Sequence, residues 1–580
     1  MIQVQISELN ATTQRTFLPY VWGTLRSYCA HFYPEINESV EWLDPLYDSV
    51  ASDEAFKSLA GVDIDVLGLS CYTWNWARQR DLAQRIKETS PECLIVAGGP
   101  HPDYNSESFF LDNPFIDIVV VADGEIPFTR ILECVVAGES NFADIPGVVA
   151  PDQNGLSVMK HPPEKPTSFP PSPYLEFSNF YESIIQDKPE RCSLVWETNR
   201  GCPYQCSFCD WGSATMSKIW TFDMGRVQAE ATWVFKQAIM AVFLADANFG
   251  ILPRDMEIAS LLEDLRQLHQ GPNHFIYNPD KNNPKRTSAI ARKFARAKLA
   301  TTHYVAVQHT DACVLKATNR VNISTEKQKN MVREMLLEGV PLGAQLILGI
   351  PGDTRDKWEQ VFADLMEWSV HDDYIVSEYI VLPNAPIATP ALREKWQYET
   401  ICRFTRDLGV EREKTSHRNA CIQADLIVAS ASFTSEDWTH MRVYSEFVTA
   451  LHNAGYTRRI AEYLHFSHGI SFRDFYNSVI NDFCRNDLFR GSWWQEIKTR
   501  IETFLVNEEA FDDIELTEIP DLSFYLKFRD WILAKTGLES AAFFAQLKTY
   551  LLDRFPDYPK LASVIDYQQQ LLITPDYDYE

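Results

Sequence analysis

The residues best suited to chemistry are three cysteines in the run Cys202-Pro-Tyr-Gln-Cys206-Ser-Phe-Cys209. The other nine of the 12 cysteines are scattered singly, as is usual for small buried hydrophobic residues of a reducing compartment. Thiolates spaced four and three residues apart on one loop can converge on a soft metal centre. Zinc is the weaker interpretation, because a structural zinc site takes four protein ligands and no second Cys/His pair with zinc spacing follows. Three cysteines on a four-iron, four-sulfur (4Fe–4S) cluster would leave one iron open to a substrate or cofactor.

A partial barrel is predicted to position this loop. The apolar run Ser193–Glu197 directly precedes the cysteines and is the size of a strand. Five more such runs alternate with amphipathic stretches, at residues 241–245, 274–277, 304–307, 346–349 and 379–382. Six repeats of strand then helix predict a partial (β/α)6 barrel of parallel strands over residues 191–395, with its active site at the carboxyl ends of the strands.

Residues 1–150 predict a second α/β domain, a doubly wound, Rossmann-like sheet. Apolar runs at Ile64–Ser70, Leu94–Gly99 and Ile116–Ala122 are separated by helical stretches, as in a parallel sheet covered on both faces. Each run ends in small or turn-forming residues, at the edge where such sheets bind ligands. Either the three turns form a ligand crevice, or their glycines only make tight turns.

The remaining segments complete a three-domain α/β chain. A cluster of prolines in residues 151–190 predicts a linker, because proline continues neither a helix nor a central strand. Residues 396–580 lose the strand pattern and predict a mostly helical accessory domain. One stretch, Lys281–Leu299, has seven basic residues and no acid. It is either a solvated helix face or a groove for an acidic substrate.

Charge and hydropathy exclude some classes of function. The chain has 53 Lys and Arg against 80 Asp and Glu, a net charge of −27, which argues against a general nucleic-acid binder or a protein of anionic membrane surfaces. No apolar run approaches the roughly 20 residues that cross a bilayer, and the N-terminal residues show no export signal. We therefore expect a cytoplasmic protein without nucleic-acid or membrane partners.

The CxxxCxxC spacing after the first strand of a partial barrel resembles the radical S-adenosylmethionine (SAM) superfamily. The resemblance implies a 4Fe–4S cluster held by Cys202, Cys206 and Cys209, whose open iron chelates SAM. Phe208 matches the aromatic position that the family places against the SAM adenine. The other positions that the resemblance assigns to SAM are Asp246, Asn248, Gln308 and Leu382. For the polar ones, the alternative is a buried strand-end group satisfied by the backbone.

The N-terminal half resembles the cobalamin-binding domain that precedes the barrel in cobalamin-dependent radical SAM enzymes, through Gly68–Trp76, Val96–His101 and Ala122–Glu125. The motif DxHxxG is absent, so cobalt would be held without a histidine ligand. Either Trp74 or Trp76 would then lie flat beneath the corrin, or both are core residues at the start of a helix. The residues expected to hold cobalamin are Ser70, Tyr72, Thr73, Trp74, Trp76, Gly98, Gly99, Pro100 and Glu125.

The resemblance implies an enzyme, most simply a cobalamin-dependent C-methyltransferase. A 5′-deoxyadenosyl radical would take hydrogen from an unactivated carbon of a peptide or natural product, which would then receive the methyl group of methylcobalamin. An external electron donor would reduce the cluster. One alternative is a radical SAM epimerase, rearrangement or ring-forming enzyme, for which Cys313 is a candidate hydrogen donor, unless it is a buried structural cysteine. The second alternative is a non-catalytic iron–sulfur sensor, which would not need the barrel.

Overall fold

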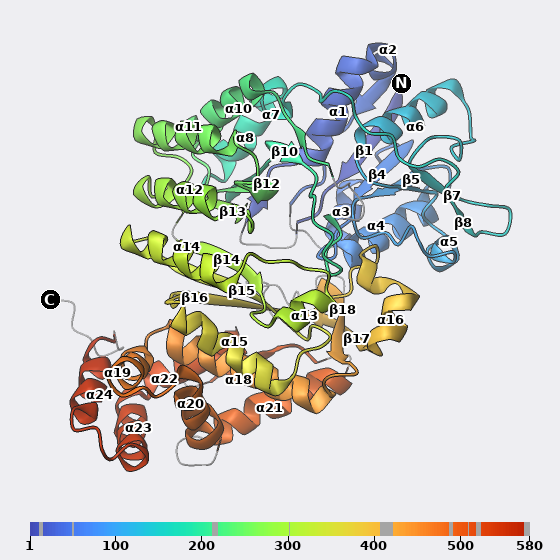
Figure 1. Ribbon diagram of the computed structural model, residues 1–580. Helices are drawn as coiled ribbons and strands as arrows, with labels where there is room; N and C mark the ends of the chain where they lie inside the picture. Colours follow the sequence, from blue (N-terminus) through green and yellow to red (C-terminus); the bar gives the residue numbers. More distant parts are fainter. Residues whose placement is uncertain are drawn as a thin grey trace. The chain divides into compact units, whose positions relative to one another are not determined.

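The structure is a computed structural model that describes residues 1–10, 15–48, 52–211, 218–300, 302–405, 422–485, 491–507, 510–517 and 524–572. The chain divides into two compact units, which are described separately. Unit 1 comprises Met1–Thr301, Val381–Leu392 and Phe404–Ala424. Unit 2 comprises Thr302–Ile380, Arg393–Arg403 and Asp425–Glu580. Figure 1 shows their helices and strands.

A seven-stranded sheet forms the N-terminal part of unit 1, in the order β3-β1-β4-β5-β6-β7-β8 (Figure 1). The first five strands are parallel, and β7 and β8 are antiparallel to their neighbours. The strand order reverses between β1 and β4, which is where a doubly wound sheet opens a ligand crevice. The strands span Ile2–Ser7 (β1), Val40–Trp42 (β3), Val66–Ser70 (β4), Leu94–Gly98 (β5), Ile118–Val120 (β6), Val148–Pro151 (β7) and Ser157–Val158 (β8).

Helices cover both faces of this sheet, so the predicted doubly wound fold is confirmed. Val66 and Val96 pack on the side of α1 and α6, whereas Leu67 and Ile95 pack with α3, α4 and α5 on the other. This alternation is the period of two that a strand requires. The helices span Tyr20–Phe32 (α1), Pro34–Glu38 (α2), Ser52–Ser58 (α3), Trp76–Thr89 (α4), Phe109–Asp112 (α5) and Glu125–Ala137 (α6).

The proline-rich residues 151–190 are more structured than a linker. Strand β8 lies within them and extends the first sheet, and two helices follow, α7 (Pro173–Glu176) and α8 (Ser178–Asp187). Pro173 occupies the first turn of α7, where its fixed φ suits a helix and its missing N–H is not needed.

A second sheet in unit 1 carries the cysteine loop. Its strands are parallel, in the order β13-β12-β9-β2. They span Thr16–Phe17 (β2), Cys192–Trp196 (β9), Ala241–Phe249 (β12) and His274–Pro279 (β13). The short strands β10 (Asn199–Arg200) and β11 (Trp220–Thr221) pair antiparallel on either side of the loop. Three helices accompany them, α10 (Met224–Lys236), α11 (Asp255–Leu268) and α12 (Pro284–Arg296).

Unit 2 contains a parallel sheet in the order β14-β15-β16, at His303–Gln308, Leu342–Leu348 and Asp373–Glu378. The prediction of a sixth strand at residues 379–382 is therefore wrong by one segment. In β16 only Tyr374 is buried and Ile375 is exposed, so the more continuous apolar run after it gave the stronger signal. The helices between the strands of this sheet are α13 (Ala312–Ala317), α14 (Thr325–Leu337) and α15 (Arg355–Glu367).

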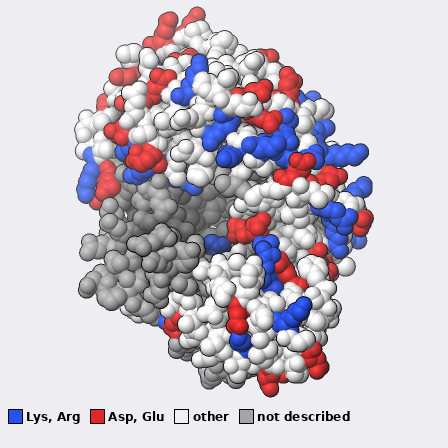
Figure 2. All heavy atoms as spheres, turned by 90° about the vertical axis from the view of Figure 1, so that its left-hand side faces the viewer, with Lys and Arg blue, Asp and Glu red and all other residues white. Residues whose placement is uncertain are grey.

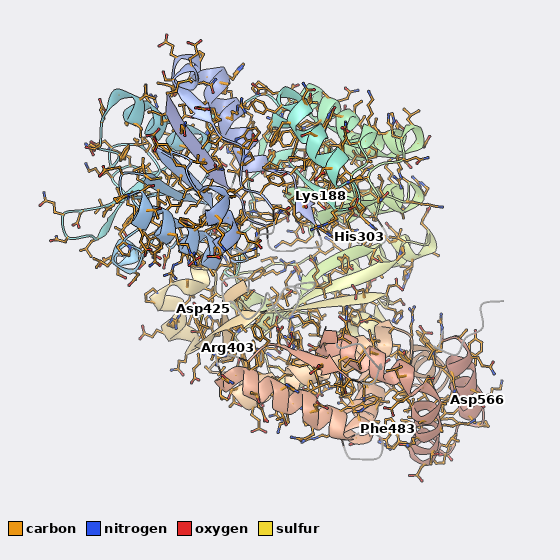
Figure 3. The ribbon with its side chains drawn as sticks, turned by 180° about the vertical axis from the view of Figure 1, so that it is seen from behind. Lys188, His303, Arg403, Asp425, Phe483 and Asp566 are labelled. Atoms are coloured by element: carbon orange, nitrogen blue, oxygen red, sulfur yellow. The ribbon has the colours of Figure 1, made fainter. Side chains whose placement is uncertain are left out.

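The C-terminal region is mostly helical, as predicted, but two small sheets interrupt it. One pairs β17 (Glu399–Thr405) with β18 (Ile422–Ala429), and the other pairs β19 (Asp513–Leu516) with β20 (Phe524–Lys527). Arg403, labelled in Figure 3, is buried and donates hydrogen bonds to the carbonyl oxygens of Phe504 and Leu505. Among the described residues, no helix is both long and apolar enough to cross a membrane.

In the sequence, the helices of the C-terminal region come before, between and after the strands of the two small sheets. Helix α16 (Pro390–Trp396) precedes β17, and two segments between the later helices, Thr449–Asn453 and Ser478–Cys484, are π-helical. The others are α18 (Ser435–Val448), α19 (Arg458–His468), α20 (Phe472–Asn477), α21 (Gly491–Val506), α22 (Phe528–Leu538), α23 (Ser540–Arg554) and α24 (Leu561–Gln570).

Candidate functional site

The cysteine loop follows β9 and β10 and turns tightly. The backbone N–H of Cys209 donates to the carbonyl oxygen of Cys206 over 3.1 Å. Cys202 and Cys206 are buried, and Cys209 and Phe208 are half-buried. Burial, together with the neighbouring Cys202 and Cys206, raises the pKa of the Cys209 thiol to about 11. A thiolate at this position therefore depends on a positively charged partner such as iron.

Two nitrogen donors from neighbouring strand ends approach the cysteine sulfurs. Asn248 Nδ2 on β12 lies 3.2 Å from Cys202 Sγ, and Lys281 Nζ after β13 lies 3.5 Å from Cys206 Sγ. The ammonium of Lys281 also lies 4.0 Å from the centre of the Tyr204 ring. Lys281 is a site residue that the sequence prediction missed. Its position directly after a predicted strand could have marked it as a candidate site residue, but the sequence prediction assigned it only to the basic run Lys281–Leu299.

The donor set fits an iron–sulfur cluster better than a single metal ion. In the described part of the chain, no group of three His, Cys, Asp or Glu side chains is arranged to hold one metal ion. A 4Fe–4S cluster does not need that arrangement, because each of its cysteines binds a different iron. N–H donors close to ligating sulfurs are also a usual feature of such clusters, since they stabilise the sulfur charge.

Asp246, predicted near SAM, is fully buried beneath the loop. Its carboxylate accepts hydrogen bonds from Thr198 N (2.7 Å), Asn199 N (3.2 Å) and Asn199 Nδ2 (2.6 Å), and also from the Thr198 hydroxyl. Burial raises the pKa of Asp246 to about 7 against these donors. The side chain is therefore engaged in fixing the chain that leads into the cysteine loop, which matches the alternative of a satisfied strand-end group.

The turn after β4 separates the two candidate tryptophans. Trp76 begins α4, is 8% exposed and packs in the core against Phe109, so it is a core residue. Trp74 is 42% exposed and stacks on Tyr72 with ring centres 4.3 Å apart. Of the two tryptophans, only Trp74 is exposed. The hydroxyl of Thr73, on the same turn, lies 3.4 Å from His101 Nδ1.

Asn75, which the sequence prediction did not select, holds this turn together. Its Nδ2 donates to the carbonyl oxygens of Ser70 (2.9 Å) and Leu9 (3.0 Å), and its Oδ1 accepts from Tyr72 N (2.8 Å). The side chain thus ties the carboxyl ends of β1 and β4 together, at the point where the strand order reverses. Its position directly before a helix was the available signal, since asparagine favours such positions.

Two glycines, Gly98 and Gly99, lie at the turn after β5, and their surroundings differ. A Cβ on Gly99, whose φ is +92°, would lie 2.5 Å from the carbonyl oxygen of Cys71, so only glycine fits there. A Cβ on Gly98 would have its nearest neighbours at 3.9 Å, so no described protein atom requires glycine at that position. The missing side chain at Gly98 keeps the backbone open at the ligand edge of the sheet. This open edge fits a large, flat group such as a corrin.

The turn after β6 is tied to the cysteine loop by charge. Glu125, the first residue of α6, is 5% exposed and accepts from Arg200 Nη1 over 2.6 Å. Arg200 also pairs with Glu197 (2.9 Å) and Asp123 (3.3 Å). The structure thus brings one predicted cobalamin residue into contact with the residue two positions before Cys202. Glu125 is thus paired with Arg200, and this contact holds the turn after β6 beside the chain that leads into the cysteine loop.

Gln308 belongs to unit 2 and Leu382 to unit 1. Gln308 ends β14 with a φ of +59°, a strained backbone of the kind often found at functional sites. Its side chain is 8% exposed, and its Oε1 has no hydrogen-bond partner among the described residues. An unpaired acceptor at the carboxyl end of a parallel strand fits a ligand contact. Leu382 is half-buried, and its carbonyl oxygen accepts from Ala385 N over 3.1 Å.

The basic run Lys281–Leu299 proves to be mainly a helix face. On α12, Lys293 and Arg296 both pair with Glu263 of α11, at 2.6 and 3.5 Å. Basic and acidic side chains are interspersed on the face shown in Figure 2, as expected of a solvated surface.

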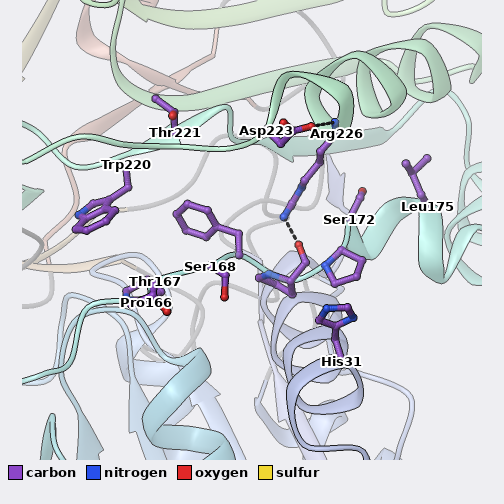
Figure 4. A pocket seen from close by; sticks show the side chains of 13 residues that line it. His31, Pro166, Thr167, Ser168, Ser172, Leu175, Trp220, Thr221, Asp223 and Arg226 are labelled. Carbon is purple, nitrogen blue, oxygen red and sulfur yellow. Dashed lines mark hydrogen bonds between the residues drawn. The ribbon is translucent and has the colours of Figure 1, made fainter.

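A cavity of about 460 Å³ lies beside the proline-rich segment (Figure 4). Residues 166–172 form one wall, and Trp220, Thr221, Asp223 and Arg226 form another. Arg226 Nη1 donates to the carbonyl oxygen of Pro170 over 2.6 Å and so joins the two walls. The lining includes none of the predicted cluster, SAM or cobalamin residues.

Comparisons with known proteins match this arrangement of parts. The family model "B12 binding domain" matches residues 39–132, and "Radical SAM superfamily" matches residues 196–365. The 2-(S-pantetheinyl)-carbapenam-3-carboxylate methyltransferase of Streptantibioticus cattleyicolor is 33% identical to this chain, over 97% of it and 84% of the relative. The chain belongs to the cobalamin-dependent radical SAM methyltransferases. It is therefore an enzyme of a family whose cofactors are a 4Fe–4S cluster, SAM and cobalamin.

A second relative supports the same family, and two solved structures support the same fold. The cobalamin-dependent radical SAM methyltransferase TokK of Streptomyces tokunonensis is 31% identical over 97% of this chain and 84% of its own. OxsB with aqua-cobalamin and SAM bound has a TM-score of 0.56 at 13% identity, over 99% of this chain and 82% of its own. TsrM of Kitasatospora setae, with cobalamin and the cluster bound, has a TM-score of 0.51 at 16% identity, over 67% of this chain and 77% of its own. At these identities, the two structures support the fold of this family member.

Proposed function

We propose that this family member transfers a methyl group to an unactivated carbon of a small natural-product carboxylate. The observation that carries the proposal is the 33% identity to 2-(S-pantetheinyl)-carbapenam-3-carboxylate methyltransferase, which extends over 97% of the chain. The match is therefore not confined to the two family models and includes C-terminal residues beyond them. A substrate of that class, a pantetheinyl-bearing carboxylate, is the first to test, ahead of a peptide.

The proposed roles of the chain's residues follow from their contacts. Cys202, Cys206 and Cys209 hold the cluster, while Asn248 and Lys281 supply N–H groups to its sulfur ligands. The open backbone at Gly98, the exposed ring of Trp74 and the half-buried turn residues Tyr72 and Thr73 form the cobalamin surface. When bound, the cofactors supply the radical and the methyl group. The protein supplies their positions and excludes water.

The domain limits are part of this proposal. We assign residues 1–150 to the cobalamin domain, 151–190 to the segment that joins it to the barrel, 191–395 to the radical SAM barrel and 396–580 to an accessory domain. The family models match within the first and third of these ranges. The joining segment and the accessory domain are the parts to examine for substrate contacts, because neither family model extends into them.

Anaerobic turnover with isotope-labelled SAM tests the proposal. Reconstituted enzyme is incubated with a chemical reductant, SAM whose methyl group carries deuterium, and 2-(S-pantetheinyl)-carbapenam-3-carboxylate. The expected result is one deuterated methyl group on a carbon of the product, together with 5′-deoxyadenosine. Formation of 5′-deoxyadenosine without a labelled methyl group on any member of the substrate class would contradict methyl transfer and favour the epimerase or rearrangement alternative.

Two cysteine variants distinguish a cluster ligand from a hydrogen donor. Cys202→Ala should lose the visible absorbance of the cluster and the formation of 5′-deoxyadenosine. Cys313→Ala is the matched control, because Cys313 is exposed on α13, which overturns the interpretation of a buried structural cysteine. Methylation at the parent rate by Cys313→Ala supports the methyltransferase, whereas loss of activity in that variant alone points to a hydrogen donor.

A further inference from the structure

Asn384 makes three side-chain hydrogen bonds to one turn of the cobalamin domain. Its Nδ2 donates to the carbonyl oxygens of Pro100 (2.9 Å) and Pro102 (2.8 Å), and its Oδ1 accepts from Asn105 Nδ2 (3.1 Å). The side chain is 6% exposed. All four residues belong to unit 1, and the turn they form follows Gly99 directly. Asn384 thus fixes the chain at the open edge of β5.

Three residues further on, the same segment contacts the cysteine loop. Ile387 is 1% exposed, and its backbone N–H donates to the carbonyl oxygen of Ser207 over 2.9 Å. Ser207 lies between the predicted cluster ligand Cys206 and the predicted adenine contact Phe208. Residues 384–387 therefore connect the turn of the cobalamin domain to the cluster loop over a very short length of chain.

The connecting segment is stiff. Pro383, Pro386 and Pro390 fix three φ angles within eight residues. The short 3-10 helix η1 (Pro386–Ala388) and a hydrogen bond of 2.9 Å from Ala388 N to Ala385 O close the backbone between them. A displacement at one anchor is thus transmitted to the other.

We propose that Asn384 is a positioning residue that sets the distance between the cobalamin turn and the cluster loop. The inference rests on the proposed function, because methyl transfer needs the substrate radical and the methyl donor at a fixed spacing. A misplacement of about 1 Å can cost about a hundredfold in rate. The sequence predicted a barrel strand at residues 379–382, and nothing in that pattern indicated that Asn384 contacts residues 100–105.

Asn384→Asp is the test variant, because it keeps the size of the side chain and removes both amide hydrogens. Two neutral hydrogen bonds are lost and a carboxylate faces two carbonyl oxygens, so we expect cobalamin release from the loaded enzyme about tenfold faster. Hydrogen–deuterium exchange should rise in residues 99–105 and remain at the parent level in β4. In turnover, more 5′-deoxyadenosine should form per methylated product, because radical formation does not require the cobalamin turn.

The control is Asn141→Asp, since Asn141 is exposed and its Nδ2 donates to Asp144 Oδ2, three residues further along the chain, over 2.8 Å. If Asn384→Asp fails to fold, Asn384→Ser serves with the same readouts. The proposal is overturned if exchange and cobalamin release match the parent, or if exchange rises equally throughout unit 1. Failure of the parent enzyme to methylate would refute the proposed function alone, because exchange and cobalamin release are measured without turnover.

Discussion

Arg200 Nη1 lies 2.6 Å from Glu125 Oε1, and this ion pair joins the start of α6 to the strand that leads into the cysteine loop. Glu197 and Asp123 complete a group of three carboxylates around one guanidinium. Burial alone would lower the pKa of Arg200, but the surrounding acids outweigh it and raise that pKa. Burial raises the pKa of Asp123 to about 6 even beside this cation. The arginine is therefore what allows three acids to be buried together.

Arg200→Met should strongly destabilise the protein. The substitution leaves three largely buried carboxylates without their cation, and breaking a buried pair from one side costs about 3 to 5 kcal/mol of unfolding free energy. Anaerobic urea unfolding of the cofactor-free protein measures the change. Arg130→Met is the matched control, because its pair with Glu133 is about half exposed and should contribute less than about 1 kcal/mol. Equal losses in the two variants would contradict the prediction.

Trp74 and Trp76 should separate cobalamin binding from stability. Trp74→Ala removes a ring that is 42% exposed, so the unfolding free energy should change little while cobalamin retention after desalting falls severalfold. Trp76→Ala empties a core position and should cost about 3 to 5 kcal/mol. Retention of cobalamin is read from the visible spectrum, and stability from urea unfolding. Unchanged retention in Trp74→Ala would remove this residue from the proposed site.

The sequence predicted the parts that depend on local pattern. Apolar runs located β4, β5, β9 and β12, and the cysteine spacing located the loop, because both signals are contained in a few adjacent residues. Strand β1 was not singled out, although it is an internal strand of the first sheet, between β3 and β4. Its sequence IQVQIS alternates like a half-exposed strand, yet Gln5 is 2% exposed because its amide bonds the carbonyl oxygens of Ile6 and Asp44.

The contacts that the sequence could not give are those between distant segments. Asp246 and Asn248 were both assigned to SAM as strand-end polar residues. Only the fold shows that the carboxylate of Asp246 accepts hydrogen bonds from Thr198 and Asn199. Arg200 meets Glu125 from 75 residues away, and Asn384 meets Pro100 from 284 residues away. Neither pair has a spacing signature, since long-range partners are set by how elements pack.

Lys281→Met should make the cluster harder to reduce. The ammonium lies 3.5 Å from Cys206 Sγ, where a positive charge favours the more negative, reduced cluster. Removing it should shift the midpoint potential to a more negative value, as followed by electron paramagnetic resonance during an anaerobic redox titration. Lys285→Met, at an exposed position on α12, is the control and should leave the potential unchanged. The same potential in both variants would show that Lys281 does not act on the cluster.

The ionisation of Glu8 should lower the stability of the protein as the pH rises towards neutrality. The Glu8 carboxylate accepts from Val21 N (2.9 Å) and Trp22 N (2.6 Å) at the start of α1, while burial raises its pKa from 4.5 to about 7. Because the folded state holds this proton up to a higher pH than the unfolded chain, its stabilising contribution is complete below about pH 4.5 and is lost as the pH rises through about 7. Asp123 and Asp246, with pKa values raised to about 6 and about 7, act in the same direction.

The expected loss for Glu8 is roughly 1 to 3 kcal/mol of unfolding free energy between about pH 5 and about pH 8. Glu8→Gln keeps one acceptor for the helix N-terminus and cannot ionise, so its unfolding free energy should decline less steeply over that range. Urea unfolding of the cofactor-free protein at several pH values measures both slopes. Parallel slopes for the parent and Glu8→Gln would mean that Glu8 is already ionised at the lower end of the range, and that the donors of Val21 and Trp22 outweigh its burial.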